Sequence, residues 1–309
     1  MTSAPPRLRP AAVRRLPSGP GVYRFRDSRD RVLYVGRATA LRQRVGSYWS
    51  DLRDRRHLRR MVAAVARIEA VACASVHEAA WLERNLLEAA MPPWNRTPGG
   101  QESLVYLRVS ERPSPRPLSV VYRKRPAPDV RYFGPYLGGV KVRRAMTGLY
   151  RALPLDGAGT ALRGAHLDLA RARGWPATAD PALTLATLAA LLDRQPAALR
   201  QVRAELEEVR DRAAGKLAFE FAARVQGELE AVDWITGPQR VTSLDPTDLD
   251  VYGWAAGTLV HFGIRGGRLC QWSQQPCPQT AAAGPLARTP AAWSAFATVN
   301  AELAATLAG

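Results

Sequence analysis

The 309-residue chain has no apolar run that approaches the roughly 20 residues a helix needs to cross a bilayer. Its first stretch, MTSAPPRLRPAAVRRLP, also lacks the apolar central segment of a signal peptide. Both absences predict a cytoplasmic protein that has no membrane partner.

Cysteine is scarce, and this limits the kinds of site the chain can build. Cys73, Cys270 and Cys277 are an odd number at spacings that fit neither a paired zinc site nor a disulfide framework, so we expect ordinary thiols. A chain of this length can bury a core without such links and has room for about two domains.

Lysine is scarce as well, because only Lys124, Lys141 and Lys216 among the 44 basic residues are not arginine. Against 27 acidic residues the formal net charge is +17, and residues 1 to 98 carry +11 of it. A bias toward arginine in the whole sequence explains part of this excess but not its concentration at one end. Since the arginine fork binds phosphate oxygens in pairs, the charge predicts an acidic partner.

The first regular elements are predicted from Gly21 onward. GVYRF and RVLYVG are short apolar runs around the polar turn DSRD, a pattern typical of a β-hairpin. A helix is expected next, beginning near Arg37 or at Thr39, which can cap it.

Two helices and a strand are predicted in the following stretch. The first helix is expected at about 55 to 67 and the strand at 68 to 74. Ser75 and Glu78 then have the spacing of a capping box, which predicts a helix from about 76 to 90.

The remaining pattern is more helical. Between 98 and 130 we expect limited structure around one strand, LVYLRV, and RYFGPY at 131 to 136 then leads into a helix. Residues 156 to 200 read as helical, and 197 to 234 as a pair of helices with Gly215 at the break.

A set of chemically useful side chains occurs in the first 98 residues. Phosphodiester hydrolysis needs an activated water, a cation that offsets phosphate charge and a group that stabilises the leaving oxygen. Tyr23 and Tyr34 lie on adjacent predicted strands, and matching registers would bring both hydroxyls to one face. Arg37 and Arg44 would project from one side of a helix that begins near Arg37. Glu83, midway along a later helix, suits a hard cation such as Mg²⁺ as a single carboxylate ligand.

These motifs resemble the N-terminal half of the UvrC family of excision-repair endonucleases and the shorter Cho-like endonucleases. LPSGPGVYRF and RVLYVGRATALRQRVGSYW are similar to the GIY and YIG motifs of the GIY-YIG nuclease module. SVHEAAWLERNLLEAAMPPWN is similar to the helix that carries the metal-binding glutamate of the family. RYFGPY matches a motif found after the nuclease domain, and KLAFEFAARVQGELEAV is similar to the UVR helical hairpin. The resemblance covers about 16 to 236, most securely 16 to 97.

Matched by position, the resemblance implies roles for individual residues. Tyr34 would be the general base or a water-orienting phenol, with Tyr23 assisting. Arg44 would hold the scissile phosphate, Glu83 would ligate one Mg²⁺ or Mn²⁺ ion, and Asn95 would help to order the site. The implied products are a 3′ hydroxyl and a 5′ phosphate.

The sequence departs from the family pattern in places. Arg37 stands where the family has lysine, and RTPGGQESLVYL replaces a lysine-containing stretch after Asn95. These departures keep open a non-catalytic DNA-binding or adaptor protein with a degenerate GIY-YIG fold, and a general nuclease that cuts RNA is a third possibility. ALPLDGAGTALRGAH has no cysteine, which argues against an iron–sulfur cluster after the RYFGPY motif.

The expected fold class is α+β, with a short, mainly antiparallel sheet flanked by helices in the nuclease domain. The expected parts are a flexible basic arm at 1–15, a GIY-YIG nuclease domain at 16–98, a connecting region with the YFGPY motif at 99–155, a helical region at 156–236 containing the UVR-like hairpin at 197–234, and a tail at 237–309 that resembles a truncated RNase H-like start.

The expected function is a metal-dependent DNA endonuclease of the UvrC/Cho type that makes the 3′-side incision in nucleotide excision repair. The expected partners are DNA and a UvrB-like protein, the latter bound through the hairpin, and a monomer is the default.

Overall fold

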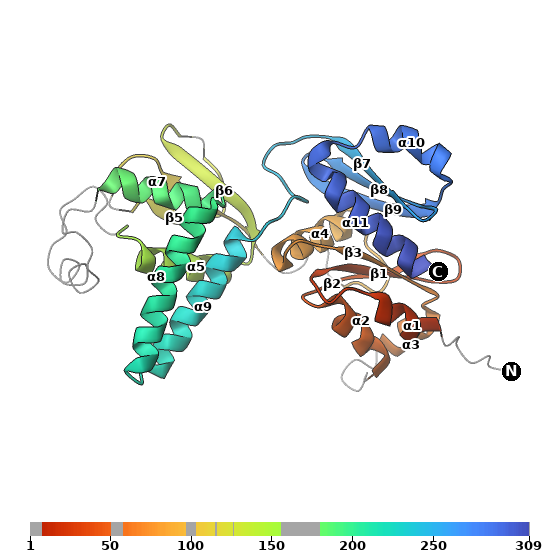
Figure 1. The fold of residues 1–309 in the computed structure, drawn as a ribbon, viewed down its shortest axis with the longest axis horizontal. Coiled ribbons are helices and arrows are strands. Elements are labelled where there is room, and N and C mark those ends of the chain that lie inside the picture. Colours follow the sequence, from red (N-terminus) through yellow and green to blue (C-terminus); the bar gives the residue numbers. More distant parts are fainter. Residues whose placement is uncertain are drawn as a thin grey trace. The chain divides into compact units, whose positions relative to one another are not determined.

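The computed structural model describes residues 8–50, 58–96, 103–114, 116–125, 127–155 and 180–308. The chain divides into two compact units, Met1–Gln101 together with Pro238–Gly309, and Glu102–Gly237 (Figure 1). Within the described ranges, none of the helices combines the length and the apolar character needed to cross a bilayer.

A three-stranded antiparallel sheet with the order β2-β1-β3 forms the centre of the first unit. Its strands are β1 (Gly21–Arg26), β2 (Val32–Ala38) and β3 (Arg67–Ala72). The helices of this part of the unit are α1 (Leu8–Arg15), α2 (Leu41–Ser50), α3 (Arg59–Ala64) and α4 (Val76–Ala89). The hairpin predicted from Gly21 is confirmed as β1 and β2.

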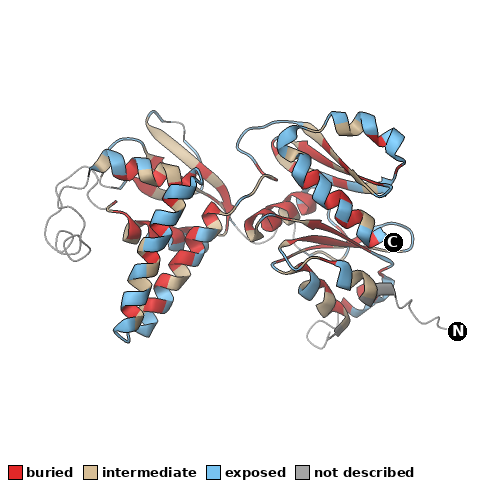
Figure 2. Cartoon of the chain, viewed as in Figure 1, coloured by how far each residue is buried: buried red, intermediate tan, exposed pale blue. Residues whose placement is uncertain are grey.

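The sheet is buried on both faces, and Figure 2 shows β1 and β3 almost entirely in the colour of buried residues. Tyr23 and Phe25 on one face are fully buried against Tyr48 of α2. Because successive side chains of a strand point to opposite faces, Arg24 lies on the other face. There it meets the C-terminal part of the chain, which packs against the same sheet.

This C-terminal part, the C-terminal lobe of residues 238–308, has its own antiparallel sheet with the order β7-β8-β9. Its elements are β7 (Leu249–Ala255), β8 (Thr258–Arg265), β9 (Arg268–Pro276), α10 (Gln279–Ala287) and α11 (Ala291–Ala308). Helix α11 lies along β3, and its Leu303 and Leu307 join the core of the N-terminal sheet. The lobe is therefore built into the first unit.

The capping pattern at the start of α4 is confirmed, with the Glu78 carboxylate bound to the N–H of Ala74 in place of that of the N-cap residue Ser75. The Ser75 hydroxyl accepts a hydrogen bond from the Glu78 backbone N–H at 2.9 Å, and the Glu78 carboxylate accepts one from the Ala74 N–H at 2.6 Å. Two backbone donors at the helix start are thus satisfied by the motif that predicted the helix.

Two local expectations for this unit were wrong. Residues 8–15, expected in a flexible arm, form α1, because Ala12 and Val13 find an apolar surface to pack on. The helix expected at 55–67 ends at Ala64 in its described part. Strand β3 begins at Arg67, because the residues from there pair with the edge of β1. The start of that expected helix, at 55–57, lies outside the described residues.

The second unit contains more sheet than the sequence predicted. Instead of one strand between 98 and 130, β4, β5 and β6 form an antiparallel sheet with the order β5-β4-β6, and RYFGPY lies inside β6. The elements are β4 (Leu104–Ser110), β5 (Leu118–Val121), β6 (Val130–Leu137), α5 (Gly139–Ala152), α7 (Pro181–Leu192), α8 (Pro196–Gly215) and α9 (Phe219–Thr236). Alternate residues of β4 are buried in the hydrophobic core of this unit, so packing against that core stabilises the sheet.

The predicted helical pair is confirmed as α8 and α9. Its apolar stripes, represented by Val202 and Val225, are buried in one core with Leu149 of α5. Gly215 is the last residue of α8, at the break where it was expected, and Leu217 in the turn that follows is left-handed, with φ of 57°. Of the helical region expected at 156–200, residues 156–179 lie outside the described ranges.

Candidate functional site

The two motif tyrosines lie on the same face of the hairpin. Tyr23 is paired with Gly36 and Phe25 with Tyr34, so Tyr23 and Tyr34 are diagonal neighbours across β1 and β2. Their ring centroids are 6.2 Å apart. The register on which the sequence prediction depended is therefore confirmed.

A third phenol, Tyr48 of α2, completes the cluster. Its hydroxyl lies 2.8 Å from the Tyr23 hydroxyl, and its ring centroid is 6.1 Å from that of Tyr34. Tyr48 was not among the site residues predicted from the sequence. A usable signal was its spacing of four residues from Arg44, which places both on one side of a helix.

The glycine of the YVG motif makes room for these rings. A Cβ atom on Gly36 would lie 2.6 Å from the Tyr23 hydroxyl and 2.8 Å from Cε1 of Tyr34. Both distances are too short for real contacts, so any larger residue would displace the phenols.

The two arginines reach the phenols from different elements. Arg37 lies on β2 and not at the start of a helix as expected, because the strand continues to Ala38 and α2 begins only at Leu41. The Arg44 guanidinium lies over the Tyr48 ring, 5.5 Å from its centroid. The prediction that Arg37 and Arg44 project from one helix was thus wrong, although both side chains line one pocket.

Glu83 projects from α4 toward β2. Its Oε1 accepts a hydrogen bond from the Arg37 backbone N–H at 3.1 Å, and its Oε2 lies 3.3 Å from Arg37 Nε. The side chain is 22% exposed, which leaves the carboxylate accessible to a ligand.

These groups meet around a pocket of about 460 Å³. Its lining comprises Tyr23, Tyr34, Arg37, Ala38, Thr39, Arg44, Val76, Ala79 and Glu83. Five of the six residues selected from the sequence therefore converge, although Tyr23 and Glu83 are 60 positions apart in the chain. The sixth, Asn95, is not among the lining residues.

Asn95 instead binds the backbone of β2. Its Oδ1 accepts from the Val35 N–H at 3.0 Å and its Nδ2 donates to the Val35 carbonyl at 2.8 Å. Val35 lies between Tyr34 and Gly36, so Asn95 is placed to hold the strand that carries them.

The electrostatics of the pocket keep the Tyr23 and Tyr34 hydroxyls neutral. Burial, followed by the neighbouring Tyr48, raises the pKa of Tyr34 above its usual value, and burial does the same to the pKa of Tyr23. Burial alone would lower the pKa of Arg44, but the phenols of Tyr23 and Tyr48 outweigh it and raise that pKa. At neutral pH the pocket therefore offers hydroxyl donors, a guanidinium and one carboxylate.

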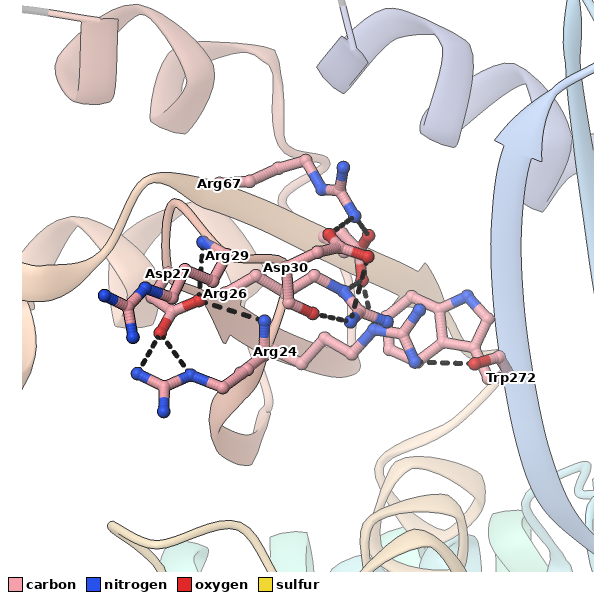
Figure 3. Close-up of polar contacts among 9 residues, drawn as sticks. Arg24, Arg26, Asp27, Arg29, Asp30, Arg67 and Trp272 are labelled. Atoms are coloured by element: carbon pink, nitrogen blue, oxygen red, sulfur yellow. Dashed lines mark hydrogen bonds and ion pairs between the residues drawn. The ribbon is translucent and has the colours of Figure 1, made fainter.

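A different polar cluster fills the opposite face of β1. Arg24 and Glu69, paired across β1 and β3, form a buried ion pair. Trp272 of β9 lies over the Arg24 side of this pair (Figure 3). Burial lowers the pKa of Arg24 to about 10. This pair was not predicted from the sequence, and the residue that covers it is 248 positions from Arg24.

Comparisons with known proteins agree with the motifs. Residues 19–96 match the family model of the UvrC-like GIY-YIG domain. A Corynebacterium aurimucosum protein named UvrABC system protein C is 31% identical over 280 residues, which cover 86% of this chain and 41% of the relative. Proteins of the same name from Sphingopyxis alaskensis and Desulforudis audaxviator are 32% and 31% identical, over 84% and 83% of this chain and 42% and 43% of their own lengths.

The chain thus spans less than half the length of these relatives, and the alignments extend well beyond the matched domain in this chain. The motifs that carry the pocket, GVYRF, YVG and the α4 helix, all lie within 19–96. Residues 19–96 are a UvrC-like GIY-YIG domain, and the chain is a GIY-YIG protein of the UvrC family.

Proposed function

We propose that the pocket hydrolyses phosphodiester bonds of DNA and that the chain makes the 3′-side incision of nucleotide excision repair. The observation that carries this proposal is the convergence of two motif phenols, two guanidinium groups and one carboxylate on one pocket. The name of the relatives, UvrABC system protein C, supports a role in a UvrABC system.

Each group has a distinct task in this proposal. Arg44, which stays charged, binds the scissile phosphate and offsets the charge that develops on it. Tyr34 orients the attacking water, because a phenol with a raised pKa is protonated at neutral pH and is a poor base in that state. Tyr23 and Tyr48 hold the Tyr34 ring through the phenol cluster.

The pocket also suits one Mg²⁺ or Mn²⁺ ion, with Glu83 as its protein ligand. Among the described residues, no three His, Cys, Asp or Glu side chains are grouped to hold a metal. One accessible carboxylate beside a phosphate site nevertheless fits Mg²⁺, which commonly takes one or two carboxylates and fills its other positions with water and substrate oxygens. Such an ion would lower the pKa of a bound water and offset phosphate charge.

We also propose that a UvrB-like partner binds at the tip of the hairpin formed by α8 and α9. The apolar stripes of these helices are buried inside the unit, so they are not the contact surface. At the tip, Leu217 is 74% exposed and Phe219 is 64% exposed. A leucine with positive φ is unusual, and two exposed apolar side chains at a turn suit a contact with another protein.

The incision proposal is tested with a duplex that carries one bulky adduct and an end label. The chain is incubated with Mg²⁺ or Mn²⁺, with and without UvrA and UvrB. A single cut on the 3′ side of the adduct is expected. Binding without cutting would instead favour a DNA-binding adaptor, and equal cutting of undamaged RNA would favour a general nuclease.

The partner proposal is tested with Phe219→Asp. This change is expected to weaken binding to UvrB by about tenfold or more, because apolar contacts at the centre of an interface carry most of its energy. Leu183→Asp is the matched control, since Leu183 is equally exposed, at 67%, but lies on α7. Equal binding by both variants would remove the hairpin tip as the contact.

A further inference from the structure

Helix α4 has two polar sides with different partners. Glu83 faces β2, where it contacts Arg37. Three other polar residues lie about 140 to 160 degrees away around the helix axis, at 3.6 residues per turn. They are Glu78, Asn85 and Glu88, and all three are bound by the C-terminal lobe.

Asn85 is the centre of this contact and is almost completely buried. Its Nδ2 donates to the Val241 carbonyl and to the Thr242 hydroxyl, both at 2.9 Å. Its Oδ1 accepts from Nε and Nη2 of Arg268 at 3.0 and 2.9 Å, and Arg268 also forms an ion pair with Glu88. The side-chain amide is therefore satisfied entirely by residues of the lobe.

The first turn of α4 is fixed by the same part of the chain. The Glu78 carboxylate accepts from the Arg240 backbone N–H at 2.9 Å, besides closing the capping box. The Ser75 hydroxyl donates to the Pro238 carbonyl at 2.6 Å. The lobe thus holds α4 near its start and past its middle.

The lobe is itself anchored on the sheet at two further points. Nη1 of Arg24 donates to the Trp272 carbonyl at 2.6 Å, and the guanidinium stacks 3.8 Å from the centroid of the Trp272 ring (Figure 3). On α11, Asn300 accepts from the Ala72 N–H at 2.7 Å and donates to the Ala72 carbonyl. A body attached to both sheet and helix fixes the distance between them, and because it contacts the sheet at two separate points, the loss of either one leaves it attached there.

We propose that the C-terminal lobe is a brace that sets the position of the Glu83 carboxylate relative to the phenols on β1 and β2, with Asn85 and Arg268 as positioning residues. This inference rests on the proposed nuclease function for its consequence in catalysis. The lobe with Arg268 lies outside residues 19–96, the segment that matches the GIY-YIG family model, whereas Asn85 lies inside it. Since a shift of about 1 Å in a catalytic group can cost about 100-fold in rate, a loosened α4 should weaken both metal binding and cutting.

The test uses the full chain and the variant Arg268→Leu. Mn²⁺ binding measured by calorimetry is expected to weaken about tenfold, the usual size of an effect from a residue that orients a metal ligand. Hydrogen exchange of the α4 amides should rise, while that of the α2 amides should not. Nicking should need about tenfold more Mg²⁺ for half of its maximal rate.

Asn300→Ala is the matched control, because it loosens the same lobe from β3 without touching α4. It should leave Mn²⁺ binding within about twofold of the parent protein. Equal losses of Mn²⁺ binding in both variants would mean that the lobe only stabilises the fold in general, and this would overturn the proposal. Should Arg268→Leu fail to fold, Thr242→Val removes one acceptor of Asn85 with little change in shape and should give a smaller loss of the same kind.

The nuclease proposal and the brace fail in distinguishable ways. If the parent protein binds Mn²⁺ no better than Glu83→Gln does, the metal site is wrong. Exchange of the α4 amides then still decides whether the lobe fixes the helix. Unchanged α4 exchange in Arg268→Leu overturns the brace, whatever the nicking assay shows.

Discussion

Tyr23 and Arg24 are neighbours on β1, yet they belong to two unlike polar clusters on opposite faces of one sheet. Tyr23 joins neutral phenols beside an open pocket, whereas Arg24 joins a charged pair that Trp272 covers. Both residues are almost completely buried, and both have a pKa displaced from its usual value.

Burial and a shifted pKa therefore do not separate a site from a structural cluster. The two clusters differ in their access to a ligand. The phenols face a pocket that a phosphate can enter, whereas the Glu69 carboxylate already forms ion pairs with Arg24, Arg26 and Arg67. Variants on the two faces should accordingly affect different quantities.

The largest effect is expected from Glu83→Gln. The amide keeps the shape and can still accept from the Arg37 N–H, but it loses the charge that a divalent ion needs. Metal-dependent nicking should fall by about 1000-fold, roughly 4 kcal/mol of transition-state stabilisation, with an unchanged melting temperature. Nicking within about tenfold of the parent rate would show that the pocket face is not the catalytic one.

Arg24→Met should have the opposite profile. Removing one partner of a buried ion pair costs about 3 kcal/mol, because Glu69 is left with less compensation. The free energy of unfolding, measured by urea denaturation, should drop by that amount. Nicking by the folded variant, measured well below its melting temperature, should stay within about threefold of the parent rate. A large loss of activity would erase the distinction between the two faces.

Tyr34→Phe tests how the phenol acts. Its loss should slow nicking by about 100-fold. Since burial holds the pKa of Tyr34 above its usual value, the phenol stays protonated from pH 7 to 9, and the pH dependence of the remaining activity should keep the slope of the parent protein. A slope that disappears in the variant would mean that Tyr34 reacts as a phenolate.

The smallest effect concerns acid stability. Burial alone would raise the pKa of Glu69, but Arg24 and Arg26 outweigh it and hold that pKa below its usual value. The stability this carboxylate contributes is present above the unfolded pKa of about 4.3 and is lost as the pH falls through the lower folded pKa. Glu69→Gln should therefore flatten the fall in unfolding free energy below about pH 5. An unchanged acid profile would contradict the assignment of Glu69 to a charged pair.

Much of the secondary structure could be predicted from local pattern. The β1–β2 hairpin, the capping box of α4 and the helical pair α8–α9 were all predicted at nearly their true positions, because turn residues, caps and apolar periodicity act over only a few residues. Strands β5 and β6 were not predicted, because Pro-rich loops lie beside them in the sequence. The residues near a strand in the sequence also do not show which other strand it will pair with.

For the pocket, the order of residue types along the sequence was enough to select both motif tyrosines, both arginines and the glutamate. It was not enough to place Arg37 on a strand or to select Tyr48. The contact between Arg24 and Trp272 spans 248 positions, and that between Asn85 and Arg268 spans 183. Local patterning determines which face of an element is apolar, but which distant segment covers that face depends on packing of the whole unit, and only the tertiary structure decided it.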